Sequence, residues 1–179
     1  ENNIEEAIKY FKMVIEKGDV NAMINYADIF KDGEFLTKNI TKAIKYYKLA
    51  INEGSDVAMC RYACMFDTGD GVEVNKEKAI KYYKMAINKG NSVAMNNYAC
   101  ILRYGEGVEI NKKEAIKYYK MAIDEGNSRS MFHYASMLEN GEGVNKNKEK
   151  AIYYYKMAAE DGDEDACNAL LRLHVQFSE

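Results

Sequence analysis

The stretch AIKYYKMAINKGNSVAMNNYA, residues 79–99, is one unit of a pattern that runs through the whole chain. Its opening Ala-Ile pair recurs at residues 7, 43, 79, 115 and 151, so each copy begins 36 residues after the one before it. Other residues keep the same register: Gly18, Gly54, Gly90, Gly126 and Gly162; Tyr26, Tyr62, Tyr98 and Tyr134; Asn39, Asn75, Asn111 and Asn147. A period of this length is typical of stacked supersecondary units.

Each unit is predicted to be a pair of antiparallel helices. Residues 79–87 place their apolar side chains on one helical face, with Asn75 as the candidate N-cap and Gly90 closing the other end. Further cap residues follow these glycines directly, so a second helix begins at once: Asp19, Ser55, Asn91, Asn127 and Asp163. That helix ends at a second glycine, such as Gly105. Asn111 and Glu114 resemble a capping box.

The pattern predicts an all-α protein of about ten helices. A lone helix at residues 1–18 precedes four hairpins at 19–54, 55–90, 91–126 and 127–162, and a trailing helix occupies 163–179. Because the chain starts at Glu1 without a methionine and directly with a helical pattern, we expect it to be a fragment of a longer protein. One loop departs from the pattern, since Phe35 stands where later loops carry a second glycine.

Composition narrows the class of protein. The net charge of −3 argues against a nucleic-acid or anionic-membrane surface. No apolar run approaches the roughly 18 residues of a membrane span. The four cysteines, Cys60, Cys64, Cys100 and Cys167, do not recur as one pair per unit. A reduced, cytoplasmic protein is therefore favoured, although a secreted or endoplasmic-reticulum location stays open.

The segment AIKYYKMAINKGNSVAMNNYACILRYGEGVEIN, residues 79–111, resembles the Sel-one-like repeat, a relative of the tetratricopeptide repeat. The resemblance covers nearly all of the chain. It departs from the family in carrying alanine for glycine at 27, 63, 99 and 135, and tyrosine for tryptophan at 10, 46, 82, 118 and 154. It implies a right-handed α-solenoid, an α/α superhelix, whose first helices line a concave surface. It also implies an adaptor or scaffold for other proteins, in signalling among other contexts, and in some eukaryotic microbes attached to a protein kinase.

The paired tyrosines of each unit are interpreted as core residues, with one ring facing inward and its neighbour wedged between units. The lysines on the opposite face are interpreted as a solvated convex surface: Lys45, Lys48, Lys81, Lys84, Lys117 and Lys120.

Positions that vary between units, while their neighbours stay constant, are candidates for partner binding. They share one helical face, and solenoids expose an extended concave face, although drift at solvent-exposed positions is the alternative. The predicted partner-binding residues are Ile24, Asp28, Cys60, Cys64, Asn96, Cys100, Arg103, Tyr104, Arg129, Phe132 and Ser136.

No catalytic, metal or cofactor site is assigned. Cys60 and Cys64 lie one helical turn apart, but no histidine or cysteine pair at matching spacing completes a metal site. They are interpreted as free thiols. His133 and His174 stand alone, outside any catalytic arrangement.

Three functions are weighed. The leading hypothesis is a non-catalytic module that binds a protein or peptide in the concave groove, without nucleic acid or membrane. The second is a hydrolase, because cysteine-rich secreted relatives of the family are associated with β-lactam binding; those relatives carry a regular cysteine pair per repeat. The third is a structural element that associates end to end with copies of itself.

Overall fold

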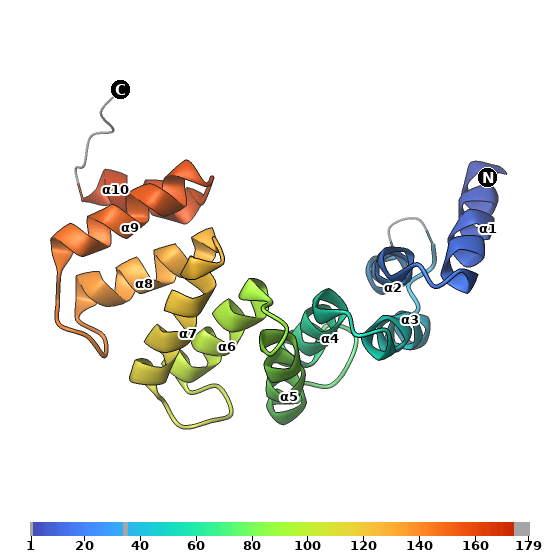
Figure 1. Ribbon diagram of the computed structural model, residues 1–179, viewed down its shortest axis with the longest axis horizontal. Helices are drawn as coiled ribbons and strands as arrows, with labels where there is room; N and C mark the ends of the chain where they lie inside the picture. The colour runs from blue at the N-terminus through green and yellow to red at the C-terminus, as the bar shows by residue number, and fades with distance from the viewer. Residues whose placement is uncertain (1, 34–35, 174–179) are drawn as a thin grey trace. The chain divides into compact units, whose positions relative to one another are not determined.

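The computed structural model describes residues 2–33 and 36–173, which form ten α-helices and no β-strand (Figure 1). The predicted all-α class is confirmed. The helices are α1 (Asn2–Glu16), α2 (Val20–Asp32), α3 (Ile40–Asn52), α4 (Asp56–Thr68), α5 (Lys76–Ile87), α6 (Ser92–Tyr104), α7 (Lys112–Asp124), α8 (Ser128–Asn140), α9 (Lys148–Glu160) and α10 (Glu164–Arg172). Phe35 and His174 lie outside the described residues.

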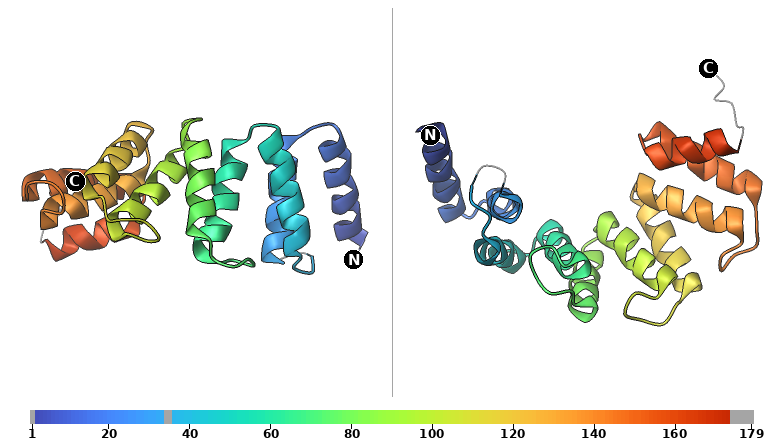
Figure 2. Two further views of the ribbon diagram at one scale, coloured as in Figure 1. Left: turned by 90° about the horizontal axis from the view of Figure 1, so that it is seen from below. Right: turned by 180° about the vertical axis from the view of Figure 1, so that it is seen from behind.

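The helices form two compact units, Glu1–Lys89 with α1 to α5 and Gly90–Glu179 with α6 to α10. In the first unit α2 packs against α3 and α4 against α5; in the second α6 packs against α7, and α9 packs against both α8 and α10. The paired helices run antiparallel, as two further views show (Figure 2). None of the described helices combines the length and the apolar character needed to cross a membrane.

The predicted N-caps are confirmed at Asn75, at the equivalent residues Asn39, Asn111 and Asn147, and at the five cap residues that begin the other helices. In each one the side-chain oxygen accepts a hydrogen bond from the backbone N–H three residues later. The predicted capping box differs in one detail. Glu114 accepts from the side-chain amide of Asn111 at 3.0 Å, because the backbone N–H of Asn111 already donates to Leu102 at 2.8 Å.

The second glycine of a hairpin loop allows the loop to approach a helix of the preceding repeat. Gly143 has φ of +69°, and a Cβ atom there would lie 2.6 Å from Cβ of Lys112 in α7. At the equivalent Gly71, a Cβ atom would lie 2.3 Å from Cδ1 of Ile40 in α3. Both positions therefore need glycine for its backbone conformation and for its lack of a side chain.

The paired tyrosines divide the core between them. The second ring of each pair is fully buried or nearly so: Tyr47, Tyr83, Tyr119 and Tyr155. The first ring contacts a tyrosine of its own hairpin edge-on, as Tyr82 does with Tyr62 at 4.8 Å. The prediction of buried rings is confirmed, but the first ring makes this contact inside its own repeat. The six lysines predicted to be solvated are all exposed.

Candidate functional site

The structure divides the predicted partner-binding residues by burial. Four have 6% or less of their surface exposed: Ile24, Cys60, Asn96 and Arg103. This corrects the expectation that these positions line an open groove. Five others are half-buried, namely Asp28, Cys64, Cys100, Phe132 and Ser136, while Tyr104 and Arg129 are exposed.

Two of the buried residues, Asn96 and Arg103 of α6, contact α8, the first helix of the next repeat. In the second unit, the hydroxyl of Ser130 in α8 donates to Oδ1 of Asn96 in α6 at 3.0 Å. Ser130 is completely buried, so this hydrogen bond joins neighbouring repeats in the core. The side chain of Asn96 therefore serves packing between two repeats of the second unit.

Arg103 is a structural residue and not a free surface charge. Its guanidinium donates to both carboxylate oxygens of Glu142, at 3.1 and 2.8 Å, and to the hydroxyl of Ser136 at 3.1 Å. These contacts join α6 to α8 and to the loop that follows α8. In the first unit Lys31 bonds to Asp70 in the same register, since both acidic partners come 39 residues after the basic one. Arg103, predicted as a partner-binding residue, therefore has its charge already paired within the protein.

The buried tyrosines donate hydrogen bonds to residues of the variable face, the helical face that carries the predicted partner-binding positions. The hydroxyl of Tyr47 donates to Asp28, that of Tyr119 to Sγ of Cys100 at 3.2 Å, and that of Tyr155 to Glu139 at 2.9 Å. Burial raises the pKa of these tyrosines, so their phenols stay protonated and act as donors. Sequence reasoning assigned these rings to the core and missed their hydroxyls. The sequence did carry an indication of these hydrogen bonds. A tyrosine recurs at the same place in every hairpin, while the residues on the neighbouring helix that accept from it vary.

Two of the predicted residues, Phe132 and Ser136, line a hollow of about 470 Å³ in the second unit. Its walls come from α8 and α10, with Tyr155 contributed by α9. The complete lining is Phe132, Ser136, Glu139, Asn140, Tyr155, Asp165, Asn168, Ala169 and Arg172. We take this α8–α10 hollow as the candidate functional site.

The charged groups of the α8–α10 hollow are paired. Arg172 donates to both oxygens of Glu139, at 2.8 and 2.7 Å, and Arg129 forms an ion pair with Asp165. These hydrogen bonds from Arg172 hold the pKa of Glu139 below its ordinary value. None of these four charged groups is therefore left unpaired for an anionic or a cationic ligand.

Phe132 is held between two neighbours that fix its ring. The guanidinium carbon of Arg129 lies 5.1 Å from the ring centroid, and the ring of Tyr155 lies 5.7 Å away. Asn140 and Asn168, both exposed, add side-chain amides at the rim. The arrangement offers an apolar aromatic surface with amide donors and acceptors beside it, which suits an uncharged peptide segment.

The ring of His133 packs against two aromatic rings. Its centroid lies 5.4 Å from that of Phe132 and 5.5 Å from that of Tyr119. Burial, together with the nearby charges of Arg129 and Arg103, lowers the pKa of His133 from 6.5 to about 4. The imidazole is therefore neutral near pH 7.

This shifted pKa predicts a pH-dependent stability. Below pH 6.5 the unfolded chain binds a proton that folded His133 does not accept until about pH 4, so the free energy of unfolding should fall as the pH drops through this window. The stabilising contribution is complete above pH 6.5. In urea unfolding, the free energy of unfolding of His133→Gln should fall less than that of the parent as the pH drops from about 6.5 to 5.

This pH window separates His133 from the carboxylates. Hydrogen bonds from Arg103 lower the pKa of Glu142. Glu142 therefore changes the free energy of unfolding only when the pH falls below 4.5, the ordinary pKa of a glutamate. An unchanged pH dependence in His133→Gln would contradict the assignment.

All four cysteines are free thiols in the structure. Among the described residues no group of three or more His, Cys, Asp or Glu side chains is arranged to hold a metal ion.

Known proteins resemble this chain in sequence pattern and in fold. A Sel1 repeat model matches residues 1–19, 20–55, 56–91, 92–127 and 128–163. No curated protein sequence matches the chain significantly. A solved Sel1 repeat protein from Oxalobacter formigenes is 28% identical, with a TM-score of 0.86 over 93% of this chain and 68% of its own.

Two further solved structures are similar. A protective antigen of uropathogenic Escherichia coli with an SLR fold is 26% identical, with a TM-score of 0.83 over 90% of this chain and 35% of its own. The chain thus spans about a third of that protein. The cysteine rich protein B of Helicobacter pylori is 25% identical, with a TM-score of 0.58 over 74% of this chain and 96% of its own.

Proposed function

Because the chain belongs to the Sel1 repeat family, whose members generally serve as protein-interaction scaffolds, we propose that this protein is a non-catalytic scaffold that binds a peptide or protein segment. We place the contact at the α8–α10 hollow. The observation that carries this proposal is Phe132, a half-buried aromatic ring that lines the hollow.

The fold does not require an aromatic side chain at this position. The equivalent residues of the other repeats, Ile24, Cys60 and Asn96, are small or aliphatic and are buried. Phe132 is larger and partly accessible, and aromatic residues are enriched among the side chains that dominate binding energy. A partner that covered the ring would remove this apolar surface from water.

The rim adds specificity for a peptide backbone. Side-chain amides such as those of Asn140 and Asn168 donate and accept hydrogen bonds at once, as the peptide group does. The charges at Glu139 and Arg172 are satisfied by each other and need no counter-ion from the ligand. We infer an extended segment with one apolar side chain over Phe132.

The hydrolase alternative gains no specific support. It rests on resemblance to cysteine-rich relatives with a regular cysteine pair per repeat, whereas the cysteines of this chain are free and irregularly placed.

The test begins with cross-linking and mass spectrometry, which identify a partner and the residues that it touches. Phe132→Ala should then weaken binding by more than about 1 kcal/mol, roughly fivefold in Kd, measured by titration calorimetry. Tyr153→Ala is the matched control, because Tyr153 lies on α9 with 57% of its surface exposed and does not line the hollow. Melting curves should show Phe132→Ala still folded.

A different pattern of losses would contradict the proposal. If Phe132→Ala binds normally while Lys117→Glu and Lys120→Glu abolish binding, the partner uses the lysine face. The α8–α10 hollow would then not be the binding site.

A further inference from the structure

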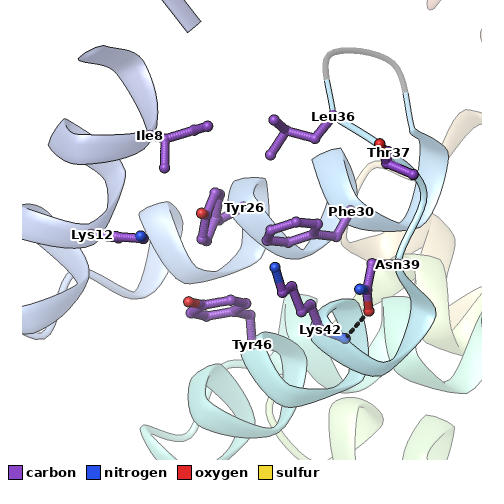
Figure 3. A pocket seen from close by; sticks show the side chains of 9 residues that line it. All are labelled: Ile8, Lys12, Tyr26, Phe30, Leu36, Thr37, Asn39, Lys42 and Tyr46. Carbon is purple, nitrogen blue, oxygen red and sulfur yellow. Dashed lines mark hydrogen bonds between the residues drawn. The ribbon is translucent and has the colours of Figure 1, made fainter. Parts of the chain in front are cut away.

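A second hollow, of about 550 Å³, lies in the first unit where α1, α2 and α3 meet (Figure 3). It shares no residue with the α8–α10 hollow, and sequence reasoning did not single it out. Its lining is Ile8, Lys12, Tyr26, Phe30, Leu36, Thr37, Asn39, Lys42 and Tyr46. We call it the α1–α3 hollow.

Three aromatic rings make its floor. Tyr26 contacts Phe30 and Tyr46 edge-on, with ring centroids 4.7 and 4.8 Å apart. Phe30 and Tyr46 lie nearly parallel, 6.2 Å apart. Ile8 and Leu36 stand above these rings from opposite sides (Figure 3). Tyr26 and Phe30 are buried, with 3% and 6% of their surface exposed, whereas Tyr46 is half-buried. The ring of Tyr46 therefore offers most of the accessible apolar surface of this floor to an apolar side chain.

Lysines surround this apolar floor. The ends of the Lys12 and Lys42 side chains point toward the rings in Figure 3. Nζ of Lys42 lies 4.9 Å from the centroid of Phe30, and Nζ of Lys45 lies 5.8 Å from that of Tyr46. These cations are held next to an apolar surface, where an approaching anion is screened less than in open water.

Three other lysines of the first unit are paired with carboxylates. Lys31 and Lys38 both form ion pairs with Asp70, and Lys76 pairs with Asp67. Among the side chains of residues 6–33 and 36–173, no carboxylate forms an ion pair with Lys12, Lys42 or Lys45. Lys12 and Lys42, which line the α1–α3 hollow, therefore carry positive charge without an ion-pair partner among the side chains that the structure describes, although the whole protein has a net charge of −3.

We propose that the α1–α3 hollow binds an acidic peptide segment of a partner protein, with an apolar side chain on the Tyr26–Phe30–Tyr46 floor and flanking carboxylates at Lys12 and Lys42. Charge complementarity selects the acidic residues, and the rings select the apolar one. A polyanion without apolar groups would leave the aromatic floor uncovered. This site goes beyond the proposed function because it is a separate contact with a defined ligand chemistry.

The probe is a fluorescein-labelled peptide with the sequence Gly-Asp-Glu-Leu-Phe-Glu-Asp-Gly, titrated with the whole chain and followed by fluorescence anisotropy. Saturable binding that weakens with added salt is expected. The double substitution Lys12→Glu with Lys42→Glu should weaken binding by about tenfold, because two attractions become repulsions. The matched control is Lys48→Glu with Lys81→Glu, which changes the net charge equally at exposed positions outside the hollow.

Two altered peptides test the two halves of the proposal. A peptide with Asn and Gln in place of Asp and Glu tests the charge, and one with Ser-Ser in place of Leu-Phe tests the apolar anchor. Both should bind more weakly than the parent peptide. Ile8→Ser, at the half-buried wall, should reduce affinity for the parent peptide but not for the Ser-Ser peptide. Melting curves establish that each variant is folded.

The outcomes distinguish this proposal from the proposed function. Equal binding by the Lys12 and Lys42 double variant and its control overturns the α1–α3 site, as does equal binding of the uncharged or Ser-Ser peptide. If Phe132→Ala alone loses the peptide, the ligand occupies the α8–α10 hollow, and only the present inference fails. Failure of Phe132→Ala to affect a cross-linked partner leaves the α1–α3 site standing.

Discussion

Tyr98→Ala should lower the free energy of unfolding by about 3–5 kcal/mol, the range for truncating a large buried aromatic side chain. Tyr98 in α6 has 4% of its surface exposed and meets the ring of Tyr118 in α7 edge-on, with centroids 5.0 Å apart. The substitution removes both the buried area and the aromatic contact that joins the two helices of a hairpin. In a repeat protein, loss of one hairpin also weakens its neighbours, because stability is the sum of repeats and their interfaces.

The measurement is urea unfolding followed by far-ultraviolet circular dichroism. Tyr153→Ala removes the same atoms from an exposed position of the same unit and should cost less than about 1 kcal/mol. Equal losses in the two variants would show that the tyrosine columns do not form the core.

Arg103→Ala is expected to have the next largest effect, about 3 kcal/mol. Removing one partner of a buried ion pair costs about 3–5 kcal/mol, because the other charge is left without compensation. Glu142 is 24% exposed, so water relieves part of that penalty and the lower end of the range applies. The loss of the hydrogen bond to Ser136 adds to the cost.

Arg172 provides a control of the same chemistry. It also donates to both oxygens of a glutamate, Glu139, but its own side chain is 59% exposed. Arg172→Ala should therefore cost less than about 1 kcal/mol, as exposed ion pairs do. A result in which the two arginine variants lose equal stability would show that Arg103 gains nothing from burial.

The role of Arg103 changes how the variable face is interpreted. Variation between repeats suggested that its charge was free for a partner, yet the arginine joins α6 to the loop after α8. Lys31 and Asp70 make the equivalent contact in the first unit. A position can therefore vary between repeats because its structural partner varies with it. Phe132 differs, because the ring is only half-buried and lines a hollow.

The two proposed sites use different chemistry. The α8–α10 hollow has paired charges at its rim and an aromatic ring with amides beside it. The α1–α3 hollow has an aromatic floor and lysines without acidic partners among the described residues. One scaffold could therefore hold two segments of different character, an uncharged one and an acidic one.

The sequence by itself determined the helices and their order. Each N-cap acts on a backbone N–H three residues away, and each apolar stripe lies within one helix, so both signals are local. The same local signals, repeated every 36 residues, are sufficient to identify the hairpins and the buried tyrosine columns. The second glycine of the three later loops was visible in the sequence too. Its structural reason was not, because the atoms that crowd Gly143 belong to Lys112 of another helix.

Only the tertiary structure decided which residues of the variable face are accessible to solvent. Helical periodicity places Asn96, Arg103 and Tyr104 on neighbouring parts of one helix surface, yet the first two are buried and the third is exposed. The difference arises from partners far along the chain, since Ser130 lies 34 residues from Asn96 and Glu142 lies 39 from Arg103. The hollows also depend on contacts between helices, because residues of three helices line each one. Periodicity describes one helix at a time, whereas burial depends on which helices pack together.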